Sequence, residues 1–211
     1  MTTPYLTEFL TIVVIHLLAV ASPGPDFALV VKQSIAHSRR AGVWTAMGLS
    51  LGVLTHVAYS LLGIGFIISR SIVLFSLIKF LGAGYLIYIG IKSLRAKRED
   101  VQHIEVSRKN DITPLAAVKM GYLTNILNPK VTLFIFSVFT QIIDPATPFM
   151  VQLVYGLEMA GMTLLWFSLI AAILNHPVVQ RRFQGIQHYV ERAMGAVLVA
   201  LGLRLAFASS K

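Results

Sequence analysis

The amino-acid sequence predicts an all-α integral membrane fold with six transmembrane helices. Hydrophobic residues make up 56% of the 211 residues and charged residues only 13%, whereas typical soluble domains have roughly 45–50% and about 25%. The mean hydropathy of +0.74 indicates the same class. Because a spanning helix needs about 20 residues, six of them use over half of the chain. We therefore expect a single membrane domain over residues 1–211.

Charge and cysteine content exclude several other classes of protein. The formal net charge is +9, but the basic residues lie in short segments between apolar runs, which is the usual pattern of cytoplasmic loops in membrane proteins. No nucleic-acid partner is expected. The chain has no cysteine, so thiol chemistry, disulfides and cysteine-ligated metals are excluded. No cofactor or metal site is expected.

The first predicted span is interrupted at its middle. A straight helix from Tyr5 to Ala36 would be ~48 Å long, well over the ~30 Å hydrocarbon core of a bilayer. Two prolines and a glycine break it, because proline removes an amide donor and clashes with the preceding turn. The predicted spans are 4–21 continued by 26–36, then 42–68, 72–94, 115–141, 148–174 and 188–207.

The fourth span carries a second break, in the segment Asn125-Ile126-Leu127-Asn128-Pro129-Lys130. Within a membrane, the backbone groups freed at a break need partners, so breaks are tolerated only where protein or a water-filled cavity covers them. A charged residue directly follows the proline in each break, Asp26 in the first and Lys130 in the second. We expect function to be concentrated at these two places.

The two breaks suggest that the chain contains two inverted three-helix repeats. When Pro25 is aligned with Pro129, the halves have similar lengths on both sides of the breaks. A unit of three spans must insert its second copy upside down, and such repeats with discontinuous helices recur in secondary transporters. The predicted units are repeat one at about 4–95, a cytoplasmic connector at about 96–113 and repeat two at about 114–209.

The distribution of basic residues predicts the orientation. Two basic residues, Arg70 and Lys211, fall on one side, which is predicted to be periplasmic or extracellular and to hold both termini. Nine fall on the other side, which is predicted to be cytoplasmic: Arg39, Arg40, Arg95, Lys97, Arg98, Arg108, Lys109, Arg181 and Arg182. A separate feature of the second span concerns packing. Gly48 and Gly52 form a face of small residues that is suited to close contact with another helix.

The two breaks together have the chemistry of a binding site. Asp26 and Lys130 carry opposite charges at equivalent positions, and an unpaired charge at that depth costs roughly 2.5–3.5 kcal/mol on insertion scales. We expect them to pair, directly or through water and substrate, and the alternative is an ion pair that only locks the halves together.

Each half-helix that starts after a break presents free amides to a carboxylate, and the exposed carbonyls could accept from an ammonium group. These features favour a zwitterion such as an amino acid. The candidate binding residues are Ser22, Pro23, Gly24, Pro25, Asp26, Asn125, Asn128, Pro129 and Lys130.

Three side chains are candidates for coupling transport to protons. Asp26 lies at the first break, while His56 and Glu158 occupy similar places in the second span of each half. A carboxylate within a span is costly unless it faces the bundle interior, and histidine titrates near neutral pH. For His56 the alternative is a hydrogen bond between helices.

Three motifs resemble the LysE/RhtB amino-acid exporters over essentially the whole chain. They are Ser22-Pro23-Gly24-Pro25-Asp26-Phe27, the run Gly-Ala-Gly-Tyr-Leu-Ile-Tyr-Ile-Gly-Ile-Lys at 82–92, and Leu123-Thr124-Asn125-Ile126-Leu127-Asn128-Pro129-Lys130. The resemblance implies export of amino acids across a bacterial inner membrane, driven by the proton motive force. The first motif resembles the homoserine/threonine efflux branch. Lysine and arginine exporters tend to carry Leu-Gly-Pro-Gln-Asn there and a histidine at the place of Lys130, so a cationic substrate is not favoured.

The predicted function is secondary active export of small neutral amino acids, threonine-like or homoserine-like, by proton antiport with alternating access. The protein is expected to be a multi-pass transporter of the bacterial inner membrane and not an enzyme. Its expected partners are the amino acid, protons and the lipid bilayer, and a homodimer is left open. The alternatives are a cation or metal-ion permease and a membrane assembly protein without transport.

Overall fold

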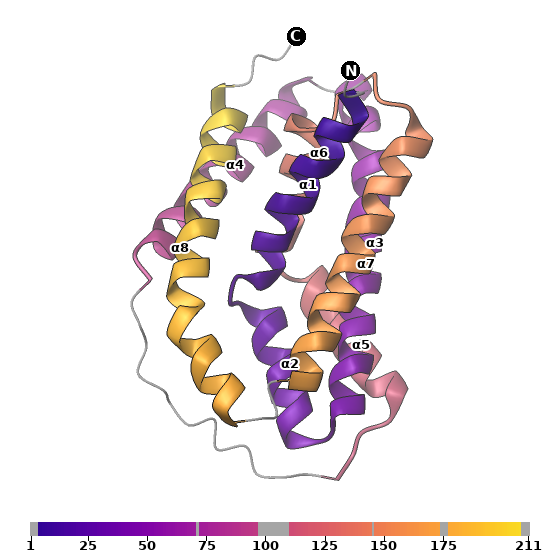
Figure 1. Cartoon of the computed structure of the whole chain (residues 1–211). Helices are drawn as coiled ribbons and strands as arrows, with labels where there is room; N and C mark the ends of the chain where they lie inside the picture. Colours follow the sequence, from indigo (N-terminus) through magenta and orange to yellow (C-terminus); the bar gives the residue numbers. More distant parts are fainter. Residues whose placement is uncertain (1–3, 71, 97–109, 145, 174–176, 208–211) are drawn as a thin grey trace.

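The computed structural model describes residues 4–70, 72–96, 110–144, 146–173 and 177–207, and within these ranges the chain consists of helices and their connections (Figure 1). The all-α prediction is confirmed for this part of the chain. In chain order the helices are α1 (Pro4–Ala21), α2 (Pro25–Ala36), α3 (Arg39–Arg70), α4 (Ile72–Leu94), α5 (Pro114–Ile126), α6 (Pro129–Gln141), α7 (Phe149–Ile173) and α8 (Pro177–Phe207).

Length and hydropathy identify fewer membrane spans than the six predicted. Over the described residues, three helices are long and apolar enough to cross a membrane, namely α1, the segment Arg39–Leu62 of α3, and α7. The pair α5 and α6, bent by 62° at its break, adds a fourth if it is one span. In α4, only Phe80–Leu94 counts as a shorter apolar helix. The six-span count therefore stays a prediction.

The last helix differs from the predicted span. Residues 177–187, expected as a loop that carries Arg181 and Arg182, are the first turns of α8. The reason is Pro177, which ends the preceding segment but is also favourable at the first position of a helix, where no amide donor is needed. Proline at this point therefore starts a helix instead of lengthening a loop.

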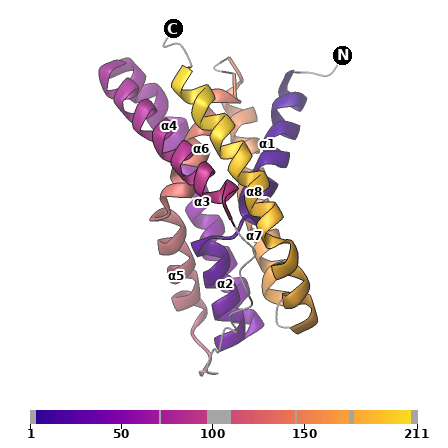
Figure 2. The same ribbon diagram turned by 90° about the vertical axis from the view of Figure 1, so that its left-hand side faces the viewer.

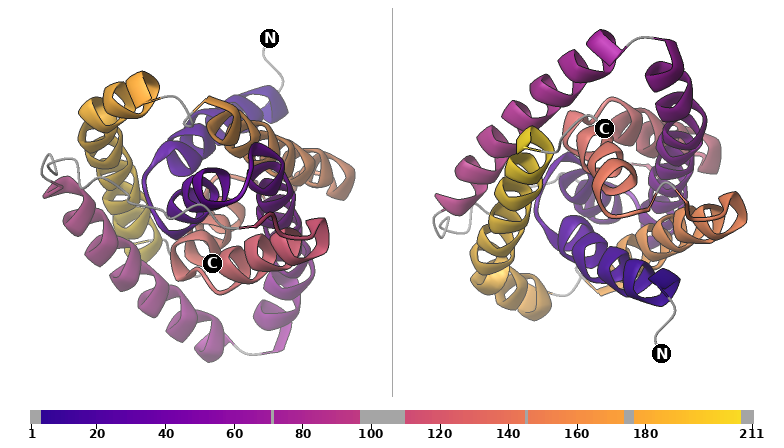
Figure 3. Two further views of the ribbon diagram at one scale, coloured as in Figure 1. Left: turned by 90° about the horizontal axis from the view of Figure 1, so that it is seen from below. Right: turned by 90° about the horizontal axis from the view of Figure 1, so that it is seen from above.

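The helices form a bundle in which the two broken helices lie near the centre. In Figure 1, α1 lies above α2 and α6 above α5, with both breaks near mid-height. The α4–α8 pair flanks this group on one side, as the turned view and the end-on views show (Figures 2 and 3). The start of α1 and the end of α8 lie at the same end of the molecule.

Several predictions about topology concern residues that the structure does not describe. The connector predicted at 96–113 is described at Ala96 and from Asn110 onward, and repeat two is described to Phe207 instead of 209. Four of the nine basic residues used for orientation lie within 97–109, and Lys211 lies beyond the described chain. The placement of both termini outside therefore stays a prediction, as do the repeat boundaries.

Both predicted breaks are confirmed as places where one helix ends and another begins. Pro25 and Pro129 each occupy the start of the second helix, where proline needs no hydrogen-bond partner. At the second break, the Asn128 side chain accepts a hydrogen bond of 3.1 Å from the backbone amide of Lys130. Asparagine is among the strongest residues at this capping position, so α6 begins at a defined residue.

Close contact between α3 and α5 depends on glycine. A Cβ atom at Gly48 would lie 2.1 Å from the carbonyl oxygen of Val118, and one at Gly121 would lie 2.1 Å from that of Thr45. Any side chain at either position would force the backbones apart. The predicted small face of Gly48 and Gly52 is thus confirmed as a helix contact, since Gly52 packs on Asn125 of α5.

The apolar core is divided into two clusters that meet at the breaks. One gathers residues of α1, α3, α4, α6, α7 and α8, among them Ile12, Val53 and Phe134. The other gathers residues of α1, α2, α3 and α7, among them Val20 and Phe167. Residues of both clusters lie close to the polar side chains of the breaks, among them Val53 and Phe134 of one cluster and Val20 and Phe167 of the other.

Candidate functional site

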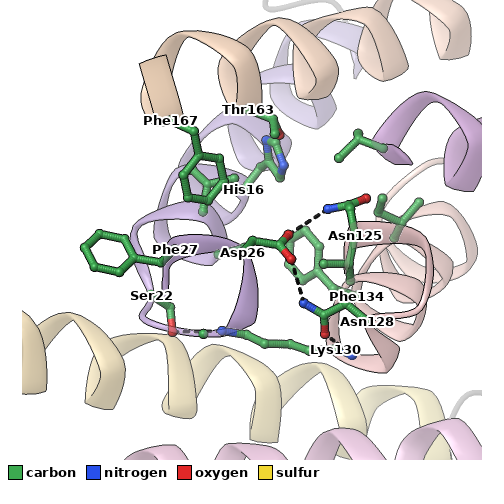
Figure 4. A pocket seen from close by; sticks show the side chains of 16 residues that line it. His16, Ser22, Asp26, Phe27, Asn125, Asn128, Lys130, Phe134, Thr163 and Phe167 are labelled. Carbon is green, nitrogen blue, oxygen red and sulfur yellow. Dashed lines mark hydrogen bonds between the residues drawn. The ribbon is translucent and has the colours of Figure 1, made fainter. Parts of the chain in front are cut away.

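A cavity lies between the two breaks and is lined by residues from both (Figure 4). It offers a volume of about 50 Å³ to the centres of water molecules, so it has room for water or for a small polar group. Of the nine predicted binding residues, six line it: Ser22, Gly24, Asp26, Asn125, Asn128 and Lys130. Pro23, Pro25 and Pro129 do not belong to the lining, and their part is to form the breaks. The binding roles of these residues stay predictions.

The Asp26 carboxylate is held by two amides from the other half of the chain. Its Oδ2 accepts a hydrogen bond of 2.7 Å from Asn125 Nδ2, and its Oδ1 accepts one of 3.2 Å from Asn128 Nδ2. All three side chains are buried, with 8% of Asp26 exposed. Because hydrogen bonds to ionised groups are stronger than neutral ones, this arrangement ties the start of α2 to the second break. We call these three residues the amide clamp.

Lys130 reaches the first break from the opposite direction. Its Nζ donates a hydrogen bond of 2.9 Å to Ser22 Oγ. The sequence predicted that Asp26 and Lys130 would pair, directly or through water and substrate. In the structure, each is bonded to uncharged groups of the opposite break, while the two charges still act on each other electrostatically. Three direct hydrogen bonds thus join the two halves, two at Asp26 and one at Lys130.

A further acidic residue acts on Lys130 and was missed by sequence reasoning. The negative charge of Glu191, on α8, acts on the Lys130 ammonium group together with that of Asp26. Glu191 lies within the span predicted at 188–207. A carboxylate within a predicted span was the signal that identified Asp26 and Glu158, so the same rule could have found it.

His56 does not line the cavity but contacts the backbone of the second break. Its Nε2 donates a hydrogen bond of 3.2 Å to the carbonyl oxygen of Asn125, and its Nδ1 bonds the Tyr59 hydroxyl. Since a carbonyl oxygen can only accept, Nε2 carries a proton. The Tyr59 hydroxyl in turn bonds the side chain of Thr132. His56 is therefore bonded between helices, as the structural alternative predicted, and its part in proton coupling stays a prediction.

Glu158 lies apart from the cavity. It is half-buried on α7 and does not belong to the cavity lining. Its Oε2 is buried without a hydrogen-bond partner among the described residues. Sequence position placed Glu158 and His56 in similar parts of the two halves, but only His56 contacts a break. The role of Glu158 in coupling stays a prediction.

Several cavity residues gave little signal in the sequence. His16, on α1, stacks on Phe134 with 6.0 Å between ring centroids and an interplanar angle of 24°. Thr163 and Phe167 line the cavity from α7. Threonine and phenylalanine are ordinary components of a membrane helix, so only packing reveals which of them face the site. The presence of His16 in an apolar span was the one available hint.

One glycine of α3 determines where Asn125 can lie. A Cβ atom at Gly52 would be 2.5 Å from Asn125 Oδ1 and 2.8 Å from Asn125 Cβ. Gly48, Gly52 and His56 follow one another at intervals of four residues, so they share one face of the helix. That face contacts α5 at Val118, at the Asn125 side chain and at the Asn125 carbonyl. Gly52 is therefore a positioning residue for the amide clamp.

The described ranges contain no group of three or more His, Cys, Asp or Glu side chains that could hold a metal ion. The charged and polar groups of the cavity come instead as a carboxylate, an ammonium group, amides and hydroxyls. Such a set suits an organic molecule that carries both charges and hydrogen-bonding groups.

Apolar helices with two proline breaks around a cavity that holds charged side chains are typical of a membrane transport protein. The chain belongs to the LysE type translocator family, whose model matches residues 17–209. The resemblance drawn from the three motifs is thereby confirmed. Membrane transport relatives and apolar helices together indicate a multi-pass protein of the bacterial inner membrane.

Curated relatives are similar over nearly their full length. The chain is 28% identical over 207 residues to the threonine efflux protein of Salmonella typhi, covering 93% of this chain and 96% of that protein. It is 28% identical over 203 residues to the threonine efflux protein of Escherichia coli (strain K12), with the same coverage. An uncharacterized membrane protein of Bacillus subtilis (strain 168), YrhP, is 29% identical over 204 residues, covering 93% and 97%. No solved structure matches the chain.

The contact between Gly52 and Asn125 leads to a prediction about transport. The substitution Gly52→Ala should displace the Asn125 side chain and weaken its hydrogen bond to Asp26. Since a hydrogen bond to a charged group contributes about 1.5–3 kcal/mol, transport should fall by about tenfold or more. Radiolabelled substrate uptake into proteoliposomes measures this change. The matched control is Gly161→Ala on α7, where a Cβ would meet nothing within 4 Å. Equal transport by both variants would contradict the positioning role.

Proposed function

We propose that this protein is a secondary active exporter of small neutral amino acids, of the threonine or homoserine type, that works by proton antiport. The family and the two threonine efflux relatives support export of an amino acid. The observation that carries the proposal is the cavity itself, where a buried carboxylate and a partly buried ammonium group belong to opposite breaks.

The chemistry of the cavity favours a zwitterion with no further charge. The substrate ammonium group would bind at Asp26, and the substrate carboxylate at Lys130 and at the N-terminus of α2. Each protein charge already has uncharged partners, Asn125 and Asn128 for Asp26 and Ser22 for Lys130. A zwitterion can thus join the site without leaving a buried charge unpaired, which a cationic or anionic side chain would not allow.

We further propose that the two halves are inverted repeats, α1 to α4 and α5 to α8, which together make six spans. Each half begins with a helix broken at proline and continues with two long helices. Counterparts pack on each other, since α3 contacts α7 and α4 contacts α8. Contacts between counterparts are expected when the halves are related by an axis through the centre of the bundle.

Hydrogen bonds at the two ends of the molecule provide a means of alternating access. At one end, Glu8 accepts hydrogen bonds from the Thr147 hydroxyl at 3.0 and 3.1 Å and from the Asp144 amide at 3.0 Å. At the opposite end, Asp111 accepts two from the Ser38 hydroxyl, at 2.8 and 3.0 Å. We call these the Glu8 latch and the Asp111 latch.

The two latches have the same construction in opposite halves. Each carboxylate lies near the start of the broken helix of one half, and each hydroxyl precedes the long helix α3 or α7 of the other half. Figure 1 places the start of α1 and the start of α5 at opposite ends of the bundle. In the proposed cycle, one latch opens while the other stays closed, so that the cavity faces one side of the membrane at a time.

Proton coupling is assigned in this proposal to Asp26, with His56 and Glu158 as further candidates. A proton on Asp26 would remove the negative charge that holds the substrate ammonium group. The substrate would then leave on the side from which protons enter, and the loss of that proton on the other side would reset the site. This sequence of events gives antiport, because substrate and proton compete for the same carboxylate.

Counterflow in proteoliposomes tests the proposed function. Threonine, homoserine and serine should exchange with labelled substrate, whereas lysine and arginine should exchange at least about tenfold more slowly because a second positive charge has no partner in the cavity. A pH gradient should drive accumulation, and a protonophore should abolish it. Flux of a metal cation in place of amino acids would support the permease alternative. No flux of any solute by folded protein would support the assembly alternative.

The role of Asp26 can be tested by a substitution that keeps its shape. Asp26→Asn should abolish proton-driven export while membrane insertion and folding are retained, because the side chain can no longer exchange a proton. The measurement is substrate accumulation in proteoliposomes under an imposed pH gradient. Asp144→Asn, at an exposed carboxylate in the α6–α7 connection, is the matched control. Normal gradient-driven export by Asp26→Asn would rule out this role.

The latches can be tested by thiol labelling, since the chain has no cysteine of its own. A cysteine at position 131, in the cavity lining, would report access to the cavity. Combined with Val131→Cys, Glu8→Ala should increase labelling by a membrane-impermeant reagent from one side of the membrane. Asp111→Ala should increase it from the opposite side.

Vesicles of known orientation distinguish the two sides in this experiment. Asp144→Ala is the control, because it removes a carboxylate close to the Glu8 latch without removing a latch acceptor. An increase from the same side in both latch variants, or no increase in either, would contradict the latch mechanism.

A further inference from the structure

Two polar atoms on one wall of the cavity lack partners. His16 and Thr163 are buried, with 3% and 1% of their surface exposed. Neither His16 Nδ1 nor Thr163 Oγ1 has a hydrogen-bond partner among the described residues. Both side chains line the cavity, and Figure 4 shows them together on the side away from Lys130. Unpaired buried polar atoms are rare in folded proteins, so each requires an explanation.

Thr163 differs in this respect from other threonines in the helices. Thr11, Thr45 and Thr140 each donate to a carbonyl oxygen four residues earlier, at 2.7 to 2.8 Å. That bond is the usual solution for a threonine hydroxyl within a helix. At Thr163 no such bond forms. Its hydroxyl therefore keeps both its donor and its acceptor capacity for a group inside the cavity.

The imidazole of His16 is held in place without using Nδ1. Its ring stacks on Phe134, and that phenylalanine belongs to the large apolar cluster. Packing of this kind fixes the direction of the ring, so Nδ1 has a defined position at the cavity. The wall thus offers one imidazole nitrogen and one hydroxyl, both uncharged groups when the imidazole is neutral.

We propose that His16 and Thr163 form a subsite for a hydroxyl group on the side chain of the substrate, and that they determine its specificity. This inference rests on the proposed function, because it gives a binding place to the side chain of an amino acid whose charged groups are bound elsewhere in the cavity. Asp26 takes the ammonium group, and Lys130 takes the carboxylate. The side chain of the substrate then faces the third wall, where His16 and Thr163 lie.

A hydroxyl group fits this wall better than the other side-chain groups. It can donate one hydrogen bond and accept others, which matches an imidazole nitrogen and a threonine hydroxyl together. A methyl group of the same size would leave both protein atoms unpaired, and sites built to bond a hydroxyl reject analogues without it. A charged group would find no opposite charge on this wall.

Threonine and valine are the decisive pair of substrates, since a methyl group replaces the hydroxyl at almost constant size. In proteoliposome counterflow, the protein should prefer threonine over valine by about tenfold or more. Thr163→Val should reduce that preference to about threefold or less, mainly through slower threonine exchange. Thr163→Ser, which keeps the hydroxyl, should retain the preference. His16→Leu should reduce it as Thr163→Val does.

Thr45→Val is the matched control for this experiment. Thr45 is fully buried on α3, donates to the Ala41 carbonyl and does not line the cavity. Its substitution should leave the ratio of threonine to valine exchange unchanged even if the absolute rates fall. The ratio is the appropriate measurement, because general damage to folding lowers both rates together.

The outcomes separate this inference from the proposed function. If the unsubstituted protein exchanges no neutral amino acid, the proposed function fails. If it exchanges threonine and valine equally, or if Thr163→Val and His16→Leu both keep the original ratio, the hydroxyl subsite alone is overturned. Should Thr163→Val not yield a single peak in size-exclusion chromatography, Thr163→Ala and His16→Leu decide the question by the same ratio.

Discussion

The structure depends on one buried interaction, the amide clamp in which Asn125 and Asn128 donate to the Asp26 carboxylate. A carboxylate and two interrupted helices would each be unfavourable inside a membrane if left alone. Together they satisfy one another, because the second break supplies side-chain donors to the charge that follows the first break. Lys130, at the second break, also donates a hydrogen bond to Ser22 at the first break. Neither break is complete without the other, and for this reason the polar cavity lies between them.

Close packing of α3 against α5 determines the geometry of this interaction. Gly48 brings the two backbones together, Gly52 leaves room for the Asn125 side chain, and His56 bonds the Asn125 carbonyl. Three positions on one helix face thus control the approach of the backbone, the side chain and the carbonyl group of the same segment. A change at any of them would reach Asp26 through Asn125. The α3–α5 interface is therefore connected to the cavity through Asn125. Of these residues, only Asp26 and Asn125 line the cavity.

In the proposed cycle, the centre of the bundle must stay together while its ends open in turn. The centre holds buried charges with several partners, which makes it costly to pull apart. At each end one carboxylate accepts hydrogen bonds from a hydroxyl group, Glu8 from Thr147 at one end and Asp111 from Ser38 at the other. Asp111 is exposed and Glu8 is half-buried, so both lie closer to water than Asp26 does. In the proposed cycle these contacts open while the centre persists. The proposed cycle needs this distribution, because the binding site must survive while access to it changes.

The sequence by itself determined the fold class, the two breaks and the charged residues at them. Hydropathy, proline and intramembrane charge are local signals, and each has a physical consequence that needs no knowledge of distant neighbours. It also led to the family through three motifs. It did not determine that Asp26 would bond two amides instead of Lys130, because donors for a buried carboxylate are chosen by which helices approach most closely. The prediction of a loop after Pro177 was wrong. Proline has no amide donor, and this one property both ends a helix and suits the first position of the next helix. Glu191 was missed although it is a carboxylate within a predicted span. His16 and Thr163 became significant only in the tertiary structure, since the direction in which a side chain points depends on how the helices pack.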